Sequence, residues 1–79
     1  MKHTFIGVMP ISSDYLLKFY LVDGSVRYFD MKPYIEQGAF KVLKDISIFN
    51  SVYLDKLEGI EWDCANLSLS KDTIIAHMY

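Results

Sequence analysis

Alternating apolar and polar positions predict a β-hairpin over residues 15–30. The stretch FYLVDGSVRYFD, residues 19–30, holds two apolar runs that meet at Asp23-Gly24. A two-residue Asp-Gly turn suits type I′ geometry, because both residues tolerate positive φ angles. Such a turn fixes the strand register. The predicted cross-strand pairs are Val22 with Ser25, Leu21 with Val26, and Phe19 with Tyr28.

This register sorts the hairpin into two faces, because successive side chains of a strand point to opposite sides. The predicted core face holds Tyr15, Leu17, Phe19, Leu21, Val26 and Tyr28. The predicted outer face holds Leu16, Lys18, Tyr20, Val22, Ser25, Arg27 and Phe29.

The segments on either side of the hairpin predict one more strand and several short helices. Residues 4–9 are apolar and β-prone, and Pro10 limits their pairing, so this strand is expected at a sheet edge. Downstream, Pro33 suits the first turn of a helix and Gly38 suits its end. A second short turn begins around Phe40, Val42 and Leu43. The side chains expected to be buried here are Phe40, Leu43 and Phe49.

A second hairpin is predicted in SVYLDKLEGIEW, residues 51–62, where two registers compete. A two-residue Glu58-Gly59 turn would place Asp55 opposite Trp62. A three-residue loop over residues 57–59, with the glycine in the left-handed bulge position, places Leu54 opposite Trp62 instead. The three-residue loop is preferred because it separates apolar from charged side chains and puts Val52 and Ile60 on the apolar face.

The C-terminal stretch predicts a short helix. Ser70 can cap it and Asp72 favours its positive end, while Ile74, Ile75 and Met78 share the inner side. The expected fold is therefore a single α+β domain over residues 1–79. It has a small antiparallel sheet made of the N-terminal strand and two hairpins, short helices between the hairpins, and a C-terminal helix.

Composition and charge restrict the class of protein. The 79 residues are 52% hydrophobic, too apolar for a disordered chain, yet no apolar run approaches the roughly 18 residues of a membrane helix. The net charge of −2 offers no broad positive field for nucleic acid. Cys64 is the single cysteine, and the N-terminal apolar run is too short for a secretory signal. These features indicate a soluble, cytoplasmic protein.

The outer hairpin face is the first candidate for function. A chain this short has enough helix to cover one side of its sheet, so the other side can remain as an exposed apolar patch. Aromatic residues beside arginine are enriched in interface hot spots. The candidate partner-binding residues are Leu16, Tyr20, Val22, Arg27 and Phe29. The alternative is that the N-terminal segment or the C-terminal helix covers this face, or that Tyr20 merely packs over Arg27.

The second candidate is an acidic strand face. In the preferred register Asp55 lies opposite Glu61, and Asp63 follows on the same side, so three carboxylates could hold a divalent ion or raise a pKa. Solvated strand faces carry such charges routinely, and no other pattern supports catalysis. The lone carboxylate of the Asp23-Gly24 turn supplies too few oxygens for calcium.

Other chemistry-bearing residues show no matching pattern. His3, His77 and Cys64 lack the spacing of a zinc site. Trp62 can stack on a ligand but, facing Leu54, is more simply a core residue. No serine elbow or glycine-rich phosphate loop is present. The sequence therefore predicts neither catalytic residues nor a metal nor a cofactor.

The order of several short motifs resembles a small bacterial family, domain of unknown function 2442. These motifs are the DG hairpin, YFD, GAF.VL.D...F (Gly38, Ala39, Phe40, Val42, Leu43, Asp45, Phe49), a strand ending in Glu61-Trp62, and NLS before the last helix. The resemblance implies a small α+β fold, a prokaryotic cytoplasmic setting and no established activity. It also implies that some members form halves of toxin–antitoxin-like gene pairs. Others carry a DNA-binding helix-turn-helix segment, of which this sequence shows no sign.

One loop departs from the family pattern, which commonly has a W.NG-like turn after the tryptophan. Here WDCAN, residues 62–66, has no glycine. The predicted function is a non-catalytic interaction module that binds a protein partner or a second copy of itself, as the antitoxin-like or regulatory half of a gene pair. The alternative is an ion-binding protein or metal-dependent enzyme that uses the acidic strand face.

Overall fold

A computed structural model of the chain describes residues 4–79. The strands are β1 (Phe5–Ile11), β2 (Leu16–Leu21), β3 (Val26–Asp30), β4 (Tyr53–Leu54), β5 (Ile60–Trp62) and β6 (Leu67–Leu69). The helices are α1 (Lys32–Ile35), α2 (Ile46–Phe49) and α3 (Lys71–His77), and the 3₁₀ turns are η1 (Gly38–Lys44) and η2 (Asp63–Ala65).

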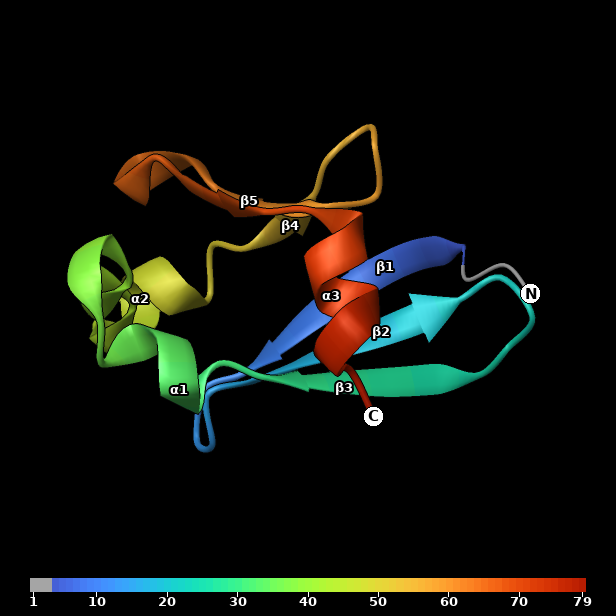
Figure 1. The fold of residues 1–79 in the computed structure, drawn as a ribbon, viewed down its shortest axis with the longest axis horizontal. Coiled ribbons are helices and arrows are strands. Elements are labelled where there is room, and N and C mark those ends of the chain that lie inside the picture. The colour runs from blue at the N-terminus through green and yellow to red at the C-terminus, as the bar shows by residue number, and fades with distance from the viewer. Residues whose placement is uncertain (1–3) are drawn as a thin grey trace.

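The strands form two antiparallel sheets, in the orders β1-β2-β3 and β4-β5-β6. Figure 1 shows the second sheet above the first, with α1 and α2 gathered at one end and α3 near the middle of the molecule. One hydrophobic cluster joins both sheets and the helices. The predicted α+β class is confirmed, although the strands divide between two sheets and β6 was not anticipated.

The first hairpin turns through three residues, so the predicted two-residue turn is wrong. The N–H of Leu21 donates to the carbonyl of Ser25 at 3.0 Å, which leaves residues 22–24 as the loop. Gly24 takes the left-handed position with φ +90°, and the Asp23 carboxylate accepts hydrogen bonds from the N–H and hydroxyl of Ser25. A type I turn followed by a left-handed glycine is the usual three-residue hairpin.

This extra loop residue shifts β3 by one position against β2. Leu17 lies opposite Phe29 and Phe19 opposite Arg27. Because a one-residue slip exchanges the two faces of a strand, β3 is turned over relative to the prediction. Phe29 is fully buried and Arg27 faces inward, while Tyr28 faces outward. The β2 assignments hold, since Leu17, Phe19 and Leu21 are all buried.

The segments around the hairpin largely follow the sequence prediction. β1 is an edge strand that runs past Pro10 to Ile11. Pro33 lies in the first turn of α1, and Gly38 has the left-handed φ of +53°. Leu43 and Phe49 are fully buried and Phe40 is half-buried. The cap of α2 was missed: the Asp45 carboxylate accepts the N–H of Ser47 at 3.0 Å.

The second hairpin also has a three-residue loop, displaced by one residue from the preferred prediction. Asp55 pairs with Gly59, so the loop is residues 56–58 and Glu58 takes the left-handed φ of +66°. Leu54 consequently lies opposite Ile60 instead of Trp62. The displacement moves every pair by two positions, so the predicted faces survive. Val52, Ile60 and Trp62 are buried as expected.

Gly59 is required by the close approach of β6. A Cβ atom at this position would lie 2.7 Å from the backbone oxygen of Leu69 and 3.0 Å from the Asp55 carboxylate. A backbone oxygen cannot move without disturbing the β5–β6 ladder, so only glycine fits here.

Glu58 ties three separate elements together. Its carboxylate accepts the N–H of Phe5 at 2.9 Å and forms a 2.9 Å salt bridge with Lys71 at the start of α3. Lys71 and then the Phe5 N–H hold the pKa of the Glu58 carboxyl below its ordinary value. Because the folded-state pKa is lowered, the stabilisation is present above the ordinary carboxyl pKa and is lost as the pH falls through the lowered one.

The C-terminal helix matches its prediction. The Ser70 hydroxyl accepts the N–H of Thr73 at 3.3 Å and so caps α3. Ile74 is fully buried, while Ile75 and Met78 pack against the core at its margin. α3 therefore fastens the second sheet to the edge of the first.

Candidate interaction surface

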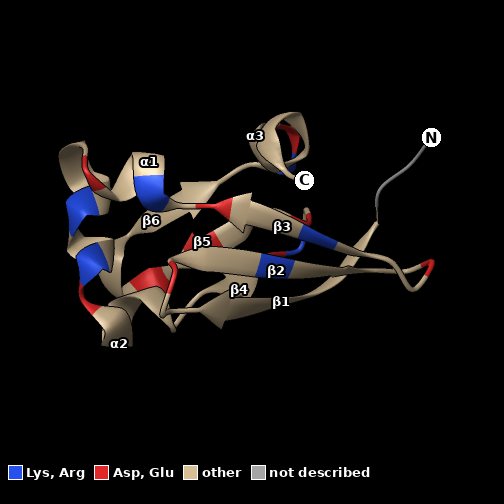
Figure 2. Cartoon of the chain, turned by 90° about the horizontal axis from the view of Figure 1, so that it is seen from below, with Lys and Arg blue, Asp and Glu red and all other residues tan. Residues whose placement is uncertain are grey.

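The outer face of the first sheet is the candidate functional surface. Figure 2 shows β1, β2 and β3 in front, with the helices at the end and edge of the sheet and β4, β5 and β6 behind it. By register, the side chains on this outer sheet face are Met9, Ile11, Leu16, Lys18, Tyr20, Val26, Tyr28 and Asp30, with Ile6 at the β1 bulge beside them. Ile6 is 64% exposed and Met9 49%.

Tyr20 lies at the centre of the outer sheet face. Its ring covers Gly7 on β1, where an added Cβ would lie 3.5 Å from the ring. The hydroxyl of Tyr20 lies 3.8 Å from the sulfur of Met9, and the Lys18 ammonium lies 5.2 Å from the ring centroid. One amphipathic ring and one cation therefore lie at the centre of an otherwise mainly apolar face.

The structure places two of the five predicted partner-binding residues on the outer sheet face and the other three elsewhere. Leu16 and Tyr20 lie on the outer sheet face as expected. Val22 is 66% exposed, but it lies in the hairpin turn. Arg27 and Phe29 do not belong to the surface: Phe29 is core, and the Arg27 guanidinium donates to the carbonyl of Val26 at 3.0 Å. The alternative that α3 covers the outer face is wrong, since α3 lies beside the β3 edge.

Several residues of the outer sheet face were missed. Val26 and Tyr28 were assigned inward because the turn was taken as two residues long. Met9 and Ile11 were not assigned to a face. Alternation along the predicted edge strand could have placed both on one face, once that strand was paired with β2. The missing information was the loop length and the β1 register, which the local sequence does not determine.

The acidic strand face does not form the predicted arrangement. Tyr53, not Asp55, lies opposite Glu61. The Tyr53 hydroxyl lies 2.8 Å from an Asp63 oxygen and 2.9 Å from a Glu61 oxygen, and these hydrogen bonds raise the pKa of the hydroxyl. Asp55 instead accepts the N–H groups of Leu57 and Gly59, so its carboxylate stabilises the turn.

The other candidates for chemistry are also separated or structural. Within residues 4–79, no group of three or more His, Cys, Asp or Glu side chains could hold a metal ion. Cys64 is an exposed free thiol 3.4 Å from the Ser51 hydroxyl, and His77 is exposed at the end of α3. His3 lies outside the described residues. Trp62 is core: it is fully buried and its indole N–H donates to the Phe49 carbonyl at 3.0 Å.

A model of one protein family matches nearly the whole chain. The family is described as "Protein of unknown function (DUF2442)", and the match covers residues 10–78. The chain belongs to this family. The DUF2442 match runs from the end of β1 to the end of α3, so it includes most of the outer sheet face. No curated protein and no solved structure matches the chain.

The loop that departs from the DUF2442 pattern contains one residue with a positive φ angle. In residues 62–66 the structure places Asn66 in the left-handed region with φ +54°, directly after the 3₁₀ turn η2. Asparagine tolerates this conformation better than most residues with a side chain. Asparagine at position 66 therefore suits the left-handed conformation that ends η2.

The helices of this DUF2442 member are short. Among the elements of residues 4–79, none combines the length and the hydrophobicity needed to traverse a lipid bilayer.

Proposed function

We propose that this chain is a non-catalytic protein-interaction module that binds a partner protein through the outer sheet face. The observation that carries the proposal is the accessible apolar surface around Tyr20, with Met9 half-exposed and Ile6 largely exposed. Contiguous exposed apolar surface on a small protein marks an interaction site. A central tyrosine is typical of the residues that dominate binding energy in such sites.

Charge on the outer sheet face indicates the chemistry of the partner. Lys18 is the basic residue of β2, the middle strand of the first sheet. The one carboxylate at the end of this face, Asp30, is paired with Lys32 at 3.0 Å. A second copy docked about a central two-fold axis would bring two Lys18 side chains together, which is unfavourable. The proposed partner is therefore a different protein with an apolar surface that carries a carboxylate opposite Lys18.

The partner is proposed to be the product of a neighbouring gene, with this chain as the antitoxin-like or regulatory half of a small prokaryotic gene pair. The toxin–antitoxin-like pairs implied by the family resemblance support this assignment. The proposed compartment is the cytoplasm, where the exposed thiol of Cys64 would remain reduced.

The proposal predicts that removing the apolar side chains at the centre of the outer sheet face abolishes partner binding. The double variant Met9→Ser/Tyr20→Ser is expected to bind the neighbouring gene product at least about 30-fold more weakly, as for the loss of a hot spot of about 2 kcal/mol. Titration calorimetry of the purified proteins measures the change. Because both residues point away from the core, the circular dichroism spectrum should be unchanged.

Leu57→Ser is the matched control, because Leu57 is 84% exposed in the turn of the second hairpin, away from the outer sheet face. Its binding should equal that of the unmodified protein. Equal binding by Met9→Ser/Tyr20→Ser would overturn the proposed surface. Light scattering that shows a dimer of the unmodified protein, and a monomer for the double variant, would overturn the choice of partner in favour of self-association.

A further inference from the structure

The edge of β3 that does not pair with β2, called here its free edge, is a second surface. It differs from the outer sheet face proposed above as the partner-binding surface. Leu21 pairs with Ser25 by hydrogen bonding, and Met31 donates its N–H to Tyr15. Along an antiparallel ladder the hydrogen-bonded pairs alternate, so residues 25, 27, 29 and 31 bond toward β2. The backbone groups of Val26, Tyr28 and Asp30 therefore point to the free edge. An open edge of this kind is a template for pairing with another extended segment.

The chain itself already uses part of this edge. The N–H of Tyr28 donates to the carbonyl of Tyr79 at 2.8 Å, and the N–H of Tyr79 donates to the carbonyl of Tyr28 at 2.8 Å. Two reciprocal bonds between the same residues define an antiparallel strand pair. The rings of these two tyrosines are 6.0 Å apart, and Tyr79 remains 63% exposed. Tyr79 is therefore a one-residue strand that lies on the edge of β3.

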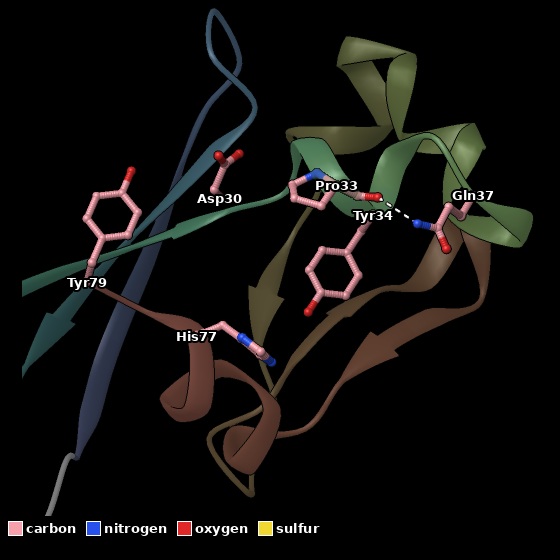
Figure 3. Close-up of a pocket in the computed structure, with 6 residues that line it drawn as sticks. All are labelled: Asp30, Pro33, Tyr34, Gln37, His77 and Tyr79. Atoms are coloured by element: carbon pink, nitrogen blue, oxygen red, sulfur yellow. Dashed lines mark hydrogen bonds between the residues drawn. The ribbon is translucent and has the colours of Figure 1, made fainter.

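A hollow of about 460 Å³ adjoins the Tyr28–Tyr79 pair, between α1 and α3. Figure 3 shows the rings of Tyr34 and His77 turned toward this space, with Tyr79 at its far side. The remaining lining residues are Asp30, Pro33 and Gln37. The Gln37 amide donates to the Pro33 carbonyl at 3.3 Å, which leaves its own oxygen free to accept a hydrogen bond.

We propose that the β3 edge and the adjoining hollow form a binding site for an extended peptide segment of a partner protein. The segment would run antiparallel to β3 and take the place of Tyr79, with its main chain bonded to Tyr28 and Asp30. Its aromatic residue would lie against Tyr28 as Tyr79 does, and its preceding residues would pass beside Asp30 over the hollow. Strand addition of this kind draws affinity from main-chain bonds and specificity from side-chain pockets.

Tyr79 of the chain itself covers part of this peptide site. α3 ends at His77, and Met78 has extended backbone angles and donates its N–H to Ile74 of α3, so Tyr79 alone is held to β3 by the Tyr28 bonds and the ring contact. A binding site that is covered for most of the time has a weaker apparent affinity, in proportion to the open fraction. Removing the cover should therefore strengthen peptide binding.

The test is a titration of the ¹⁵N-labelled full chain with the strand-forming peptide acetyl-TVTYT-amide, followed by NMR. The amide signals of Tyr28 and Asp30 are expected to shift and to saturate. Tyr79→Pro should bind the peptide at least about ten-fold more tightly, because proline lacks the N–H that bonds to Tyr28. The extended angles of Met78 tolerate a following proline, so the fold should be unaffected.

The peptide acetyl-TVTPT-amide is the control, because its proline lacks the N–H that would donate to the Tyr28 carbonyl, so saturable binding should be abolished. Unchanged Tyr28 and Asp30 signals at millimolar acetyl-TVTYT-amide, in both proteins, would overturn the proposal. Equal affinity of both proteins for the peptide would also overturn it, because Tyr79 would then not occupy the peptide site. Met9→Ser/Tyr20→Ser should bind this peptide normally, so the outcome is independent of the outer-face proposal.

Discussion

Replacing Phe29 with alanine is expected to lower the free energy of unfolding by about 3–5 kcal/mol, the usual cost of removing a buried aromatic ring. Phe29 is fully buried, lies opposite the fully buried Leu17, and has its ring centroid 5.5 Å from that of Tyr34. A domain of 79 residues has roughly 4–12 kcal/mol of stability in total. The variant should therefore lose between about a quarter and all of this stability.

Urea denaturation of Phe29→Ala beside Tyr20→Ala measures this effect. Tyr20 is the matched control because it is an aromatic residue of the same hairpin on the opposite face. Its removal should change stability by less than about 1 kcal/mol, as is common for surface positions. A two-residue turn would place Phe29 on the same outer face as Tyr20 and would remove the difference between the two variants. Equal midpoints for the two variants, or a lower midpoint for Tyr20→Ala, would contradict the three-residue loop.

Trp62 is the second position where a large effect is expected. Its side chain is fully buried, its indole N–H donates to the Phe49 carbonyl at 3.0 Å, and its ring meets that of Phe40 edge-on. Trp62→Ala should lower stability by about 3–5 kcal/mol. Trp62→Phe keeps an aromatic ring but leaves the Phe49 carbonyl without its buried donor, which should cost about 1–3 kcal/mol.

Thermal unfolding of the two Trp62 variants, with Tyr53→Phe as control, checks this order. Tyr53 lies on the opposite face of the same sheet, where its hydroxyl meets exposed carboxylates. Loss of the Tyr53 hydroxyl should change the free energy of unfolding by less than about 0.5 kcal/mol. A Trp62→Phe midpoint equal to that of the unmodified protein would show that the indole hydrogen bond does not stabilise the link between β5 and α2.

Periodicity was sufficient to predict the β2 face, the second-hairpin faces and the C-terminal helix. In each case apolar residues recur at the spacing of one strand or helix face, as in Leu17, Phe19 and Leu21. The Ser70 cap and the edge position of β1 follow from residue type and from Pro10. These features depend on local sequence, so they can be predicted without knowledge of tertiary contacts.

Loop length was not determined by local sequence in either hairpin. Asp23-Gly24 fits a two-residue turn and the end of a three-residue loop equally well. The burial of Phe29 against Leu17, a tertiary contact, favours the second arrangement. In the second hairpin, Glu58 takes the strained left-handed position because its carboxylate binds Lys71 and the Phe5 N–H, both distant in sequence.

Only part of the candidate site could be predicted, again because strand register depends on tertiary contacts. The outer-face residues of β2 follow from alternation, whereas those of β1 and β3 depend on register, and the Tyr28–Tyr79 pair depends on where the C-terminal helix ends. Strand β6 was missed because Leu67–Leu69 is too short to show a distinct period.

The measurement that tests the hairpin register most directly is a set of nuclear Overhauser effects between Hα protons of β2 and β3. Hα protons are closest in non-hydrogen-bonded antiparallel pairs. The three-residue loop predicts strong Hα–Hα effects between Tyr20 and Val26 and between Lys18 and Tyr28. Strong effects between Leu21 and Val26 and between Phe19 and Tyr28 would instead place Phe29 on the outer face and contradict the surface described for this protein.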